Sequence, residues 1–583
     1  MLKSILPVAL LALGISAAMP ARAEDPAFKA YRDSIMGNFQ GYRTEIKNNY
    51  EKFREEINAN YAKFLRGEWV ETPAREKRKM PIGNVTPVKP VILDTPDPEI
   101  EDPVVQAAPL RDIERRKHIR EIDPTAPVLG DLTINPLDTA ASVSPVEIRQ
   151  GERRKRVNYQ DPTRPDLGGI EGNLAVNATP IVVSPNPLPR AKVKTVEIPK
   201  PKQQPMPVVE VQIDSPKPTS HMYATVYGTQ LALSEPDMLG VRLADNSNKS
   251  IADTWEKLAD GRLDRTLKEC LDLRQSHSFN DWAYLNFLGS VAQSLAPRDA
   301  DLQTVIQSYL YTNSGYKMRL GRAEGKLVLL YASEHQIYDT PYIYVDNTSY
   351  YPLNSKAASY EFCDAAFPNE SSLSLLLTST PRLASKVSEP RQLHSRKGID
   401  AETQVNENLL KFYEGYPSSA VNNDMMSRWM MYCNTPLCEE VRETLYPTLS
   451  AELDGRGLYG QVNRLLNFVQ TAFKYEYDDV VWGHDRPFFP DESVYYPACD
   501  CEDRTALFTR LVRDLVGLDC AIVYYPGHLA AAVAFPASEQ IQGDFISVDG
   551  RDFLICDPTF IGANAGRTMT GMDNNQATAA VLR

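Results

Sequence analysis

Three residues near the C-terminus have the types and the order of a thiol-based catalytic centre: Cys501, His528 and Asp557. A thiol attacks as its thiolate, so a nearby imidazole must take the proton, and a carboxylate orients that imidazole and fixes its tautomer. The N-terminal end of a helix, where Cys501 is expected, favours negative charge on sulfur. The sequence therefore predicts a Cys-His-Asp nucleophilic site.

The element that positions Cys501 is a predicted helix. Residues 503–515 carry leucine and valine at helical spacing, and Gly517 follows as a stop signal. Acidic residues in a first helical turn stabilise it through the helix dipole. We therefore expect Glu502 and Asp503 to support the helix and to point away from the sulfur, where a negative charge would oppose thiolate formation.

The other two residues lie at strand ends. Residues 519–525 and 529–535 are predicted strands separated by Pro526-Gly527, and residues 553–556 form a third strand that Asp557-Pro558 stops. This places the histidine at the start of the second strand and the aspartate after the third.

The ordered motifs of this stretch resemble the transglutaminase-like superfamily of papain-like cysteine enzymes. They are CED-x-x-A-L on a helix, GH opening a strand, and DPT after another strand. Upstream, VNRLLNFVQTAFKYEYD and FFPDESVYYP resemble the helix and approach loop before the nucleophile in bacterial members. The resemblance covers roughly residues 455–570. It implies Cys501 as nucleophile, His528 as general base and acid, and Asp557 as the orienting residue.

The resemblance also implies acyl transfer at an amide or ester carbonyl of a protein or peptide substrate, without a cofactor. Water would resolve the thioester in a peptidase or amidase, and an amine would resolve it in a cross-linking enzyme. The second oxyanion donor, beside the backbone N–H of Cys501, is expected to be an upstream aromatic or amide side chain. Gln470 and Trp482 are both candidates.

A zinc site, a disulfide and an inactive scaffold are the alternatives to this catalytic site. A zinc site made by Cys499, Cys501, His484 and Cys520 lacks the usual ligand spacing, so no metal is expected. A local disulfide suits Cys433 and Cys438, although spacing does not fix the pairing. The rival function is a catalytically inactive transglutaminase-like scaffold or adaptor.

Residues 1–23 read as a cleaved signal peptide, with Lys3, an apolar run and Ala21-Arg22-Ala23. We expect a periplasmic or secreted protein without a transmembrane span after cleavage. The net charge of −13 argues against nucleic acid as a partner.

Residues 24–70 carry aromatic and isoleucine side chains in an eleven-residue repeat, as in FKAYRDSIMGN and FQGYRTEIKNN. This period keeps one apolar stripe on a helix, as in a coiled coil. The stripe needs a partner surface, so self-association, envelope contact and packing on the protein itself all remain open.

The fold class expected is α+β, in several parts. Residues 71–219 are rich in proline and predict a disordered linker. A non-catalytic α+β domain follows at 220–395, and the transglutaminase-like domain occupies 396–583. Aligning Gly315 with Gly517 suggests that the middle region is a degenerate copy, with Asp299 at the position of Cys501 and Lys326 at that of His528.

Overall fold

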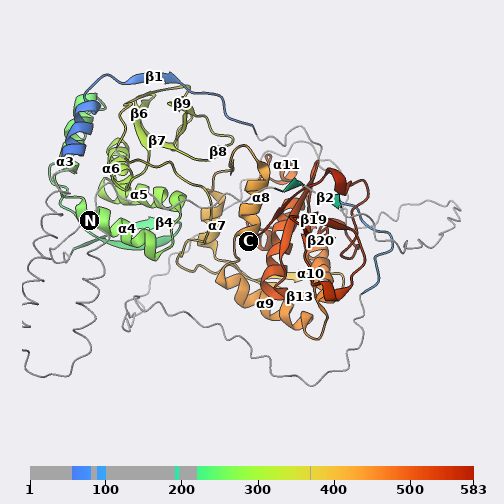
Figure 1. Cartoon of the computed structure of the whole chain (residues 1–583). Coiled ribbons are helices and arrows are strands. Elements are labelled where there is room, and N and C mark those ends of the chain that lie inside the picture. The colour runs from blue at the N-terminus through green and yellow to red at the C-terminus, as the bar shows by residue number, and fades with distance from the viewer. Residues whose placement is uncertain are drawn as a thin grey trace, which may run out of the picture.

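Figure 1 shows the computed structural model of the chain, which describes residues 55–79, 88–99, 191–192, 194–195, 220–367 and 369–582. The expected signal peptide, most of the aromatic-striped helix and most of the linker lie outside the described residues. The described part mixes helices and strands, as an α+β class requires. Among its helices, none combines the length and the apolar character needed to cross a membrane.

The middle region combines a hairpin, four helices and an antiparallel sheet. The hairpin strands are β4 (His221–Val226) and β5 (Thr229–Ser234), and Tyr227 and Gly228 turn the chain with φ of 47° and 76°. The helices are α3 (Asn248–Leu258), α4 (Asp264–Ser276), α5 (Asp281–Leu295) and α6 (Ala300–Asn313). The sheet has the order β1-β11-β6-β7-β10-β9, with strands β1 (Val70–Pro73), β6 (Met318–Ala323), β7 (Lys326–Ala332), β9 (Ile343–Val345), β10 (Thr348–Pro352) and β11 (Ser359–Phe362).

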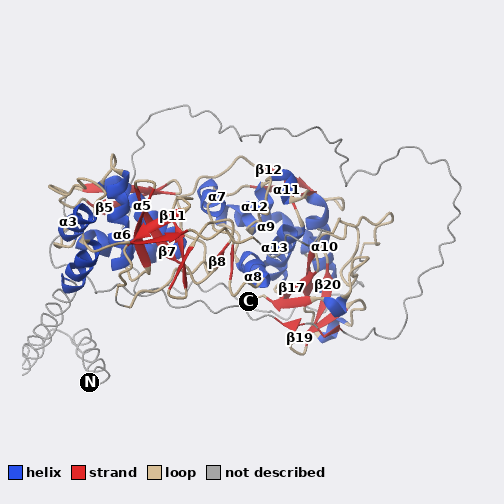
Figure 2. Ribbon diagram, turned by 90° about the horizontal axis from the view of Figure 1, so that it is seen from above, coloured by secondary structure: helices blue, strands red, loops and turns tan. Residues whose placement is uncertain are grey.

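Short elements connect this region to the C-terminal one. In Figure 2, β8 and α7 lie between the two larger groups of helices and strands. The connecting elements are β8 (Gln336–Ile337), paired with β14 (Ser419–Ala420); the hairpin of β12 (Arg391–His394) and β13 (Asp400–Thr403); and helices α7 (Glu407–Glu414), α8 (Met425–Asn434) and α9 (Glu439–Leu453). One cluster of buried apolar side chains runs through both regions, so the core has no break at the expected boundary between 395 and 396.

The C-terminal region holds helices on one side of a second antiparallel sheet. The helices are α10 (Leu458–Ala472), α11 (Asp478–Val481), α12 (Pro490–Tyr495) and α13 (Cys501–Leu511), and a short parallel pair joins β15 (Lys474–Tyr475) to β16 (Ala498–Cys499). The sheet strands are β17 (Cys520–Tyr525), β18 (His528–Val533), β19 (Phe545–Val548), β20 (Arg551–Cys556) and β21 (Thr578–Val581). Their order is β19-β20-β18-β17-β21.

A short stretch of the expected linker closes this sheet. β2 (Ala191–Lys192) pairs in parallel with β19 at one edge, and β3 (Lys194–Thr195) pairs in parallel with β21 at the other. Because the two strands are separated by a single residue, they bridge both edges, and the sheet closes on itself like a small barrel.

The two sheets share one topology. The order β9-β10-β7-β6-β11 repeats as β19-β20-β18-β17-β21, and a helix precedes each set, α6 in one and α13 in the other. Both helices begin after an aspartate, so Ala300 rather than Asp299 occupies the place of Cys501. Lys326 opens β7 as His528 opens β18. The middle sheet therefore lacks a nucleophile and an imidazole at the equivalent positions.

The described end of the aromatic-striped segment packs on the protein itself. Residues 55–65 are helical, and the ring of Tyr61 lies 4.7 Å from that of Trp255 and 4.8 Å from that of Phe367. Arg66 forms ion pairs with Asp253 and Glu256 on α3. In Figure 1 this segment runs beside α3.

The linker expected at 71–219 is structured in three places, which corrects that boundary. β1 pairs antiparallel with β11 at one edge of the middle sheet, and Arg75 forms an antiparallel bridge with Tyr342, which comes directly before β9 at the other edge. Residues 88–99 lie along the C-terminal region, and 191–195 complete its sheet. Open sheet edges have unpaired N–H and C=O groups, and such groups can hold a segment that lacks a core of its own.

All eight cysteines lie within the described residues and are free thiols, so the disulfide considered for Cys433 and Cys438 is not formed. Both side chains are buried, and their thiols have other partners. Cys438 interacts with Asp491, and Cys433 with Thr509 on α13. Their orientation toward different elements explains why proximity in sequence does not give a bridge.

Candidate active site

Cys501 is the first residue of α13, as predicted. Asp503 stabilises this helix start, because its carboxylate accepts from the backbone N–H of Asp500 at 3.1 Å and from that of Phe488 at 2.7 Å. Such reciprocal capping satisfies donors that a helix N-terminus otherwise leaves unpaired. Asp503 thus points away from the sulfur, as expected.

His528 and Asp557 form a buried pair. His528 Nε2 lies 2.8 Å from Asp557 Oδ2, and their side chains are 0% and 2% exposed. The backbone N–H of Thr559 donates to the other carboxylate oxygen at 2.8 Å and so fixes its orientation. β18 and β20 are neighbours in the sheet, which is why residues so far apart in sequence meet.

The second ring nitrogen of His528 is the one available for chemistry. Nδ1 is buried and has no hydrogen-bond partner among the described residues. When Nε2 carries the proton and donates to Asp557, Nδ1 has a lone pair and can accept a proton. This is the tautomer that a general base requires.

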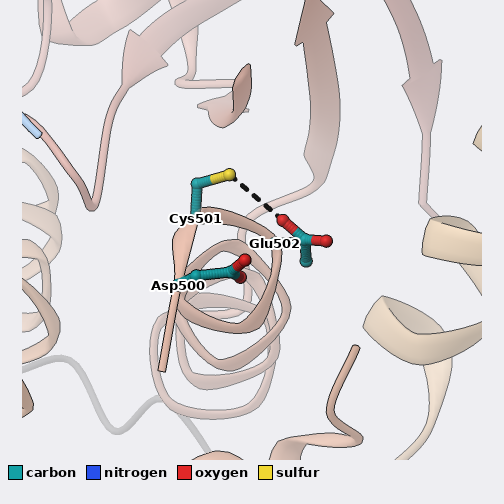
Figure 3. Close-up of side chains that lie close together, drawn as sticks. All are labelled: Asp500, Cys501 and Glu502. Carbon is teal, nitrogen blue, oxygen red and sulfur yellow. Dashed lines mark hydrogen bonds between the residues drawn. The ribbon is translucent and has the colours of Figure 1, made fainter. Parts of the chain in front are cut away.

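The sulfur of Cys501 lies beside the residue that follows His528. The backbone of Leu529 interacts with the thiol, and Thr505 Oγ1 on α13 donates to the carbonyl of Leu529 at 3.1 Å. In this structure, however, Sγ donates to Glu502 Oε2 at 3.1 Å (Figure 3). No hydrogen bond joins Sγ to the imidazole within the described part of the chain.

The prediction that Glu502 points away from the sulfur is therefore wrong. Its side chain turns back from the first helical turn toward the thiol, while Asp500 and Asp503 close the helix cap between them. Burial, followed by the charges of Glu502 and Asp500, raises the pKa of the Cys501 thiol well above its usual range. The resting thiol is protonated at neutral pH.

The carboxylates around the sulfur include two groups with the spacing of cation ligands. One is Asp500, Cys501 and Glu502, and the other is Asp478, Asp485 and Glu502; the ligand atoms of each lie within 4.8 Å of one another. Carboxylate oxygens suit hard divalent cations such as Ca²⁺ or Mg²⁺. Of the four residues considered for zinc, only Cys501 belongs to either group.

Gln470 has a structural role that differs from the one predicted. Its side-chain Nε2 donates to the carbonyls of Asp557, Phe560 and Ala563 at 3.1, 2.7 and 3.0 Å, and Oε1 accepts from the N–H of Gly562 at 3.3 Å. The amide is fully occupied in holding the loop that carries Asp557. It is not free to bind an oxyanion.

Trp482 follows α11 and stacks with other side chains. The guanidinium of Arg486 lies 4.2 Å from the Trp482 ring centroid, and the rings of Tyr496 and Phe488 lie 5.0 and 5.9 Å away. The tryptophan thus belongs to an aromatic group around a partly buried arginine.

Two positioning residues were not foreseen. The Tyr477 hydroxyl is buried and has no hydrogen-bond partner among the described residues. Burial, followed by the charge of Cys501, raises the pKa of Tyr477 to about 12, which places its hydroxyl within electrostatic reach of the sulfur. The sequence KYEYD at the start of α11 contains this tyrosine, and that is the signal by which it could have been found.

The other is Arg504, which is fully buried. It donates to the carbonyl of Phe473 at 2.6 Å and to those of Gln470 and Pro558 at 3.2 and 3.4 Å. It thereby ties the nucleophile helix to the end of α10 and to the loop after β20.

No family model, curated protein or solved structure matches this chain. The described residues include a thiol at a helix start beside Leu529, a buried imidazole–carboxylate pair and a buried hydroxyl without a hydrogen-bond partner among them. These groups are of the types used in nucleophilic acyl transfer.

Proposed function

We propose that the chain is a transglutaminase-like thiol enzyme that transfers acyl groups from amide bonds of a protein or peptide substrate. The observation that carries the proposal is the buried His528–Asp557 pair at 2.8 Å, with Nδ1 of the imidazole left without a partner. A buried ring nitrogen without a partner costs stability, and such costs are common at functional sites. Cys501 stands at the helix start beside Leu529, the next residue along β18.

The reaction begins when His528 Nδ1 takes the proton from Cys501 Sγ and the thiolate attacks the substrate carbonyl carbon. The resulting oxyanion accepts hydrogen bonds from the backbone N–H of Cys501 and from the Tyr477 hydroxyl. The C–N bond then breaks as the imidazolium gives its proton to the leaving amine, which leaves a thioester on the sulfur. Water or a second amine, deprotonated by the neutral imidazole, attacks the thioester and releases the thiolate, which takes back the proton.

Before the first step, the contact between Sγ and Glu502 must break. In the resting arrangement the thiol donates to that carboxylate at 3.1 Å, and the sulfur must rotate about its χ1 angle to face the imidazole. Side-chain rotation of this kind is fast compared with typical turnover, so it sets an equilibrium penalty rather than a slow step. Glu502 thus restrains the resting enzyme.

The location follows from the signal peptide expected at 1–23, and we place the enzyme in the periplasm or outside the cell. Hydrolysis is the outcome we favour, as a peptidase or amidase, with amine transfer as the other outcome of the same thioester. The part of the aromatic stripe that comes before residue 55 would supply self-association or contact with the envelope, because the part after it packs on the protein itself.

A specific observation favours a second function, that of an inactive scaffold or adaptor. Burial, followed by the charges of Glu502 and Asp500, raises the pKa of Cys501, and the sulfur has a carboxylate as its partner instead of the imidazole. Both features are expected in a site whose chemistry has been lost.

A thiol-reactive amide or ester probe separates the two functions. We expect Cys501 to be labelled faster than the other seven cysteines, and His528→Ala to suppress this labelling at least tenfold. His484→Ala is the matched control, because His484 is exposed and its Nδ1 lies 3.1 Å from the carbonyl oxygen of Trp482. Equal labelling of Cys501 and the remaining cysteines, or no effect of His528→Ala, would support the scaffold.

A further inference from the structure

Residues 88–99, which we name the strap, lie along the loops that carry His528 and Asp557. The backbone N–H of Val88 donates at 3.1 Å to the carbonyl of Gly527, the residue just before the histidine. Further along, Ile92 bridges in parallel to Ile561, four residues after the aspartate. The strap thus contacts the backbone close to both residues of the imidazole–carboxylate pair.

The centre of the strap is bound by two backbone hydrogen bonds with Ile561, one in each direction. Ile561 donates to the carbonyl of Val91 at 2.9 Å, and Leu93 donates to the carbonyl of Ile561 at 3.0 Å. Apolar side chains accompany these bonds. Val88, Val91 and Leu93 pack against a buried cluster made by Phe560, Ala563 and Met569.

The downstream end is held by charge. The carboxylate of Asp97 accepts from the backbone N–H of Asn564 at 2.9 Å and pairs with Arg567 at 2.5 Å, while its own N–H donates to Gly562 at 2.9 Å. Gly562 has a φ of +92°, a conformation that favours glycine, and Pro96 lies against it. The strap and the loop that it contacts therefore both carry residues suited to this contact.

The loop 557–564 is consequently held from two sides. On the inside, the Gln470 amide binds the carbonyls of Asp557, Phe560 and Ala563. On the outside, the strap binds Ile561, Gly562 and Asn564. Catalytic side chains need positions held within about half an ångström, and this depends on the groups that support them.

We propose that the strap is a positioning element for the His528–Asp557 pair, supplied in cis by the segment upstream of both folded regions. This inference rests on the proposed function of that pair. With the strap bound, Gly527 and the loop 557–564 are fixed, so the imidazole and carboxylate keep their 2.8 Å contact and Nδ1 stays directed. With the strap displaced, the loop has only its inner support.

The test uses the full chain with Val91→Asp and Leu93→Asp together, which puts two charges into the apolar cluster and displaces the strap. Asp94→Asn is the matched control, because Asp94 is an exposed residue of the same segment. Amide hydrogen exchange at Ile561 and Leu93 reports whether the strap is released. The rate of Cys501 labelling, measured from about pH 6 to about pH 9, reports the state of the His528–Asp557 pair. This range includes about 6.5, the usual pKa of an imidazole.

We expect exchange to rise in the double variant, labelling to fall about tenfold or more, and its pH profile to become that of His528→Ala. Asp94→Asn should behave as the wild type. A synthetic peptide of residues 88–99 added to the double variant should restore both the rate and the profile. Rescue and a changed pH profile distinguish positioning from a general loss of stability.

Labelling that stays at the wild-type rate while exchange shows release would overturn the inference, and so would faster labelling, which would mean that the strap shields the site. If the double variant fails to fold, Asp97→Asn weakens only the polar end and should give a smaller change of the same sign. An unchanged rate and profile in that folded variant, with exchange raised at Asn564, would also contradict the inference. Failure of the proposed function looks different, because the wild type itself would then show no labelling that depends on His528.

Discussion

Replacing Glu502 with glutamine tests the central electrostatic feature of the site. The carboxylate that accepts from Cys501 Sγ at 3.1 Å is removed, while the side-chain length and an acceptor oxygen remain. The glutamine amide can also donate to the thiolate, which the carboxylate cannot do. The substitution therefore removes a charge that opposes ionisation and keeps the local packing.

The magnitude follows from Coulomb's law. Two unit charges about 4 Å apart repel by about 4 kcal/mol at an effective dielectric of about 20. Glu502 is only partly buried, and solvent screening reduces this to about 1–2 kcal/mol. Each 1.4 kcal/mol changes the thiolate population about tenfold. A less basic thiolate is also a weaker nucleophile, which removes part of the increase in rate. We therefore expect labelling of Cys501 to be about three- to sixfold faster near neutral pH.

The assay is the second-order rate of alkylation of Cys501 by iodoacetamide as a function of pH, followed by mass spectrometry of the peptide that carries it. In the wild type the rate should keep rising above neutral pH, because the pKa of the thiol is raised. In Glu502→Gln the rise should begin at lower pH. Asp479→Asn removes an exposed acid from α11 and serves as the control. A slower rate in Glu502→Gln, or the same acceleration in both variants, would refute the electrostatic argument.

Three further predictions concern the supporting residues. Tyr477→Phe should reduce turnover of an amide or ester substrate about 10²- to 10³-fold while leaving alkylation by iodoacetamide unchanged, since only acyl transfer develops an oxyanion; an equal loss in both assays would contradict that role. Gln470→Ala should lower the free energy of unfolding by about 1–3 kcal/mol in a denaturant titration, because it leaves buried carbonyls unpaired; a value near zero would mean that water replaces the amide. Burial raises the pKa of Asp491 to about 6, so the folded state binds a proton at this carboxyl group more tightly than the unfolded state does. This contribution to the free energy of unfolding is full below pH ~4, the ordinary pKa range of a carboxyl group, and is lost as the pH rises through about 6. Thermal melts of the wild type and Asp491→Asn across this window should show a flatter pH dependence in the variant, and parallel curves would argue against it.

Local sequence signals predicted much of the C-terminal region because each element there is marked by its own residues. β17, β18 and β20 begin and end within two residues of the predicted strands. The helix at Cys501 also formed, although it begins two residues earlier, because Asp503 caps it from inside the first turn. The imidazole–carboxylate pair followed from the order of these elements.

Features that depend on contacts distant in sequence could not be predicted in this way. The direction of Glu502 depends on which of two neighbouring acids caps the helix, and composition does not decide this. The occupation of the Gln470 amide depends on a loop nearly a hundred residues away. Proline-rich composition indicates a segment without its own core, but it cannot reveal that β1 and the strap bind to sheets and loops formed later in the chain.

The closure of the C-terminal sheet by residues 191–195 has a consequence for how the molecule is made. The closing strand is synthesised well before β19 and β21, between which it fits, so the barrel cannot be completed until the last strand has left the ribosome. Contacts of such long sequence separation slow folding and prolong the exposure of unpaired edges to proteases and to other chains. A fragment that begins at residue 396 would have an open seam in its sheet, and we expect it to be recovered largely as aggregate unless the earlier stretch is supplied as well.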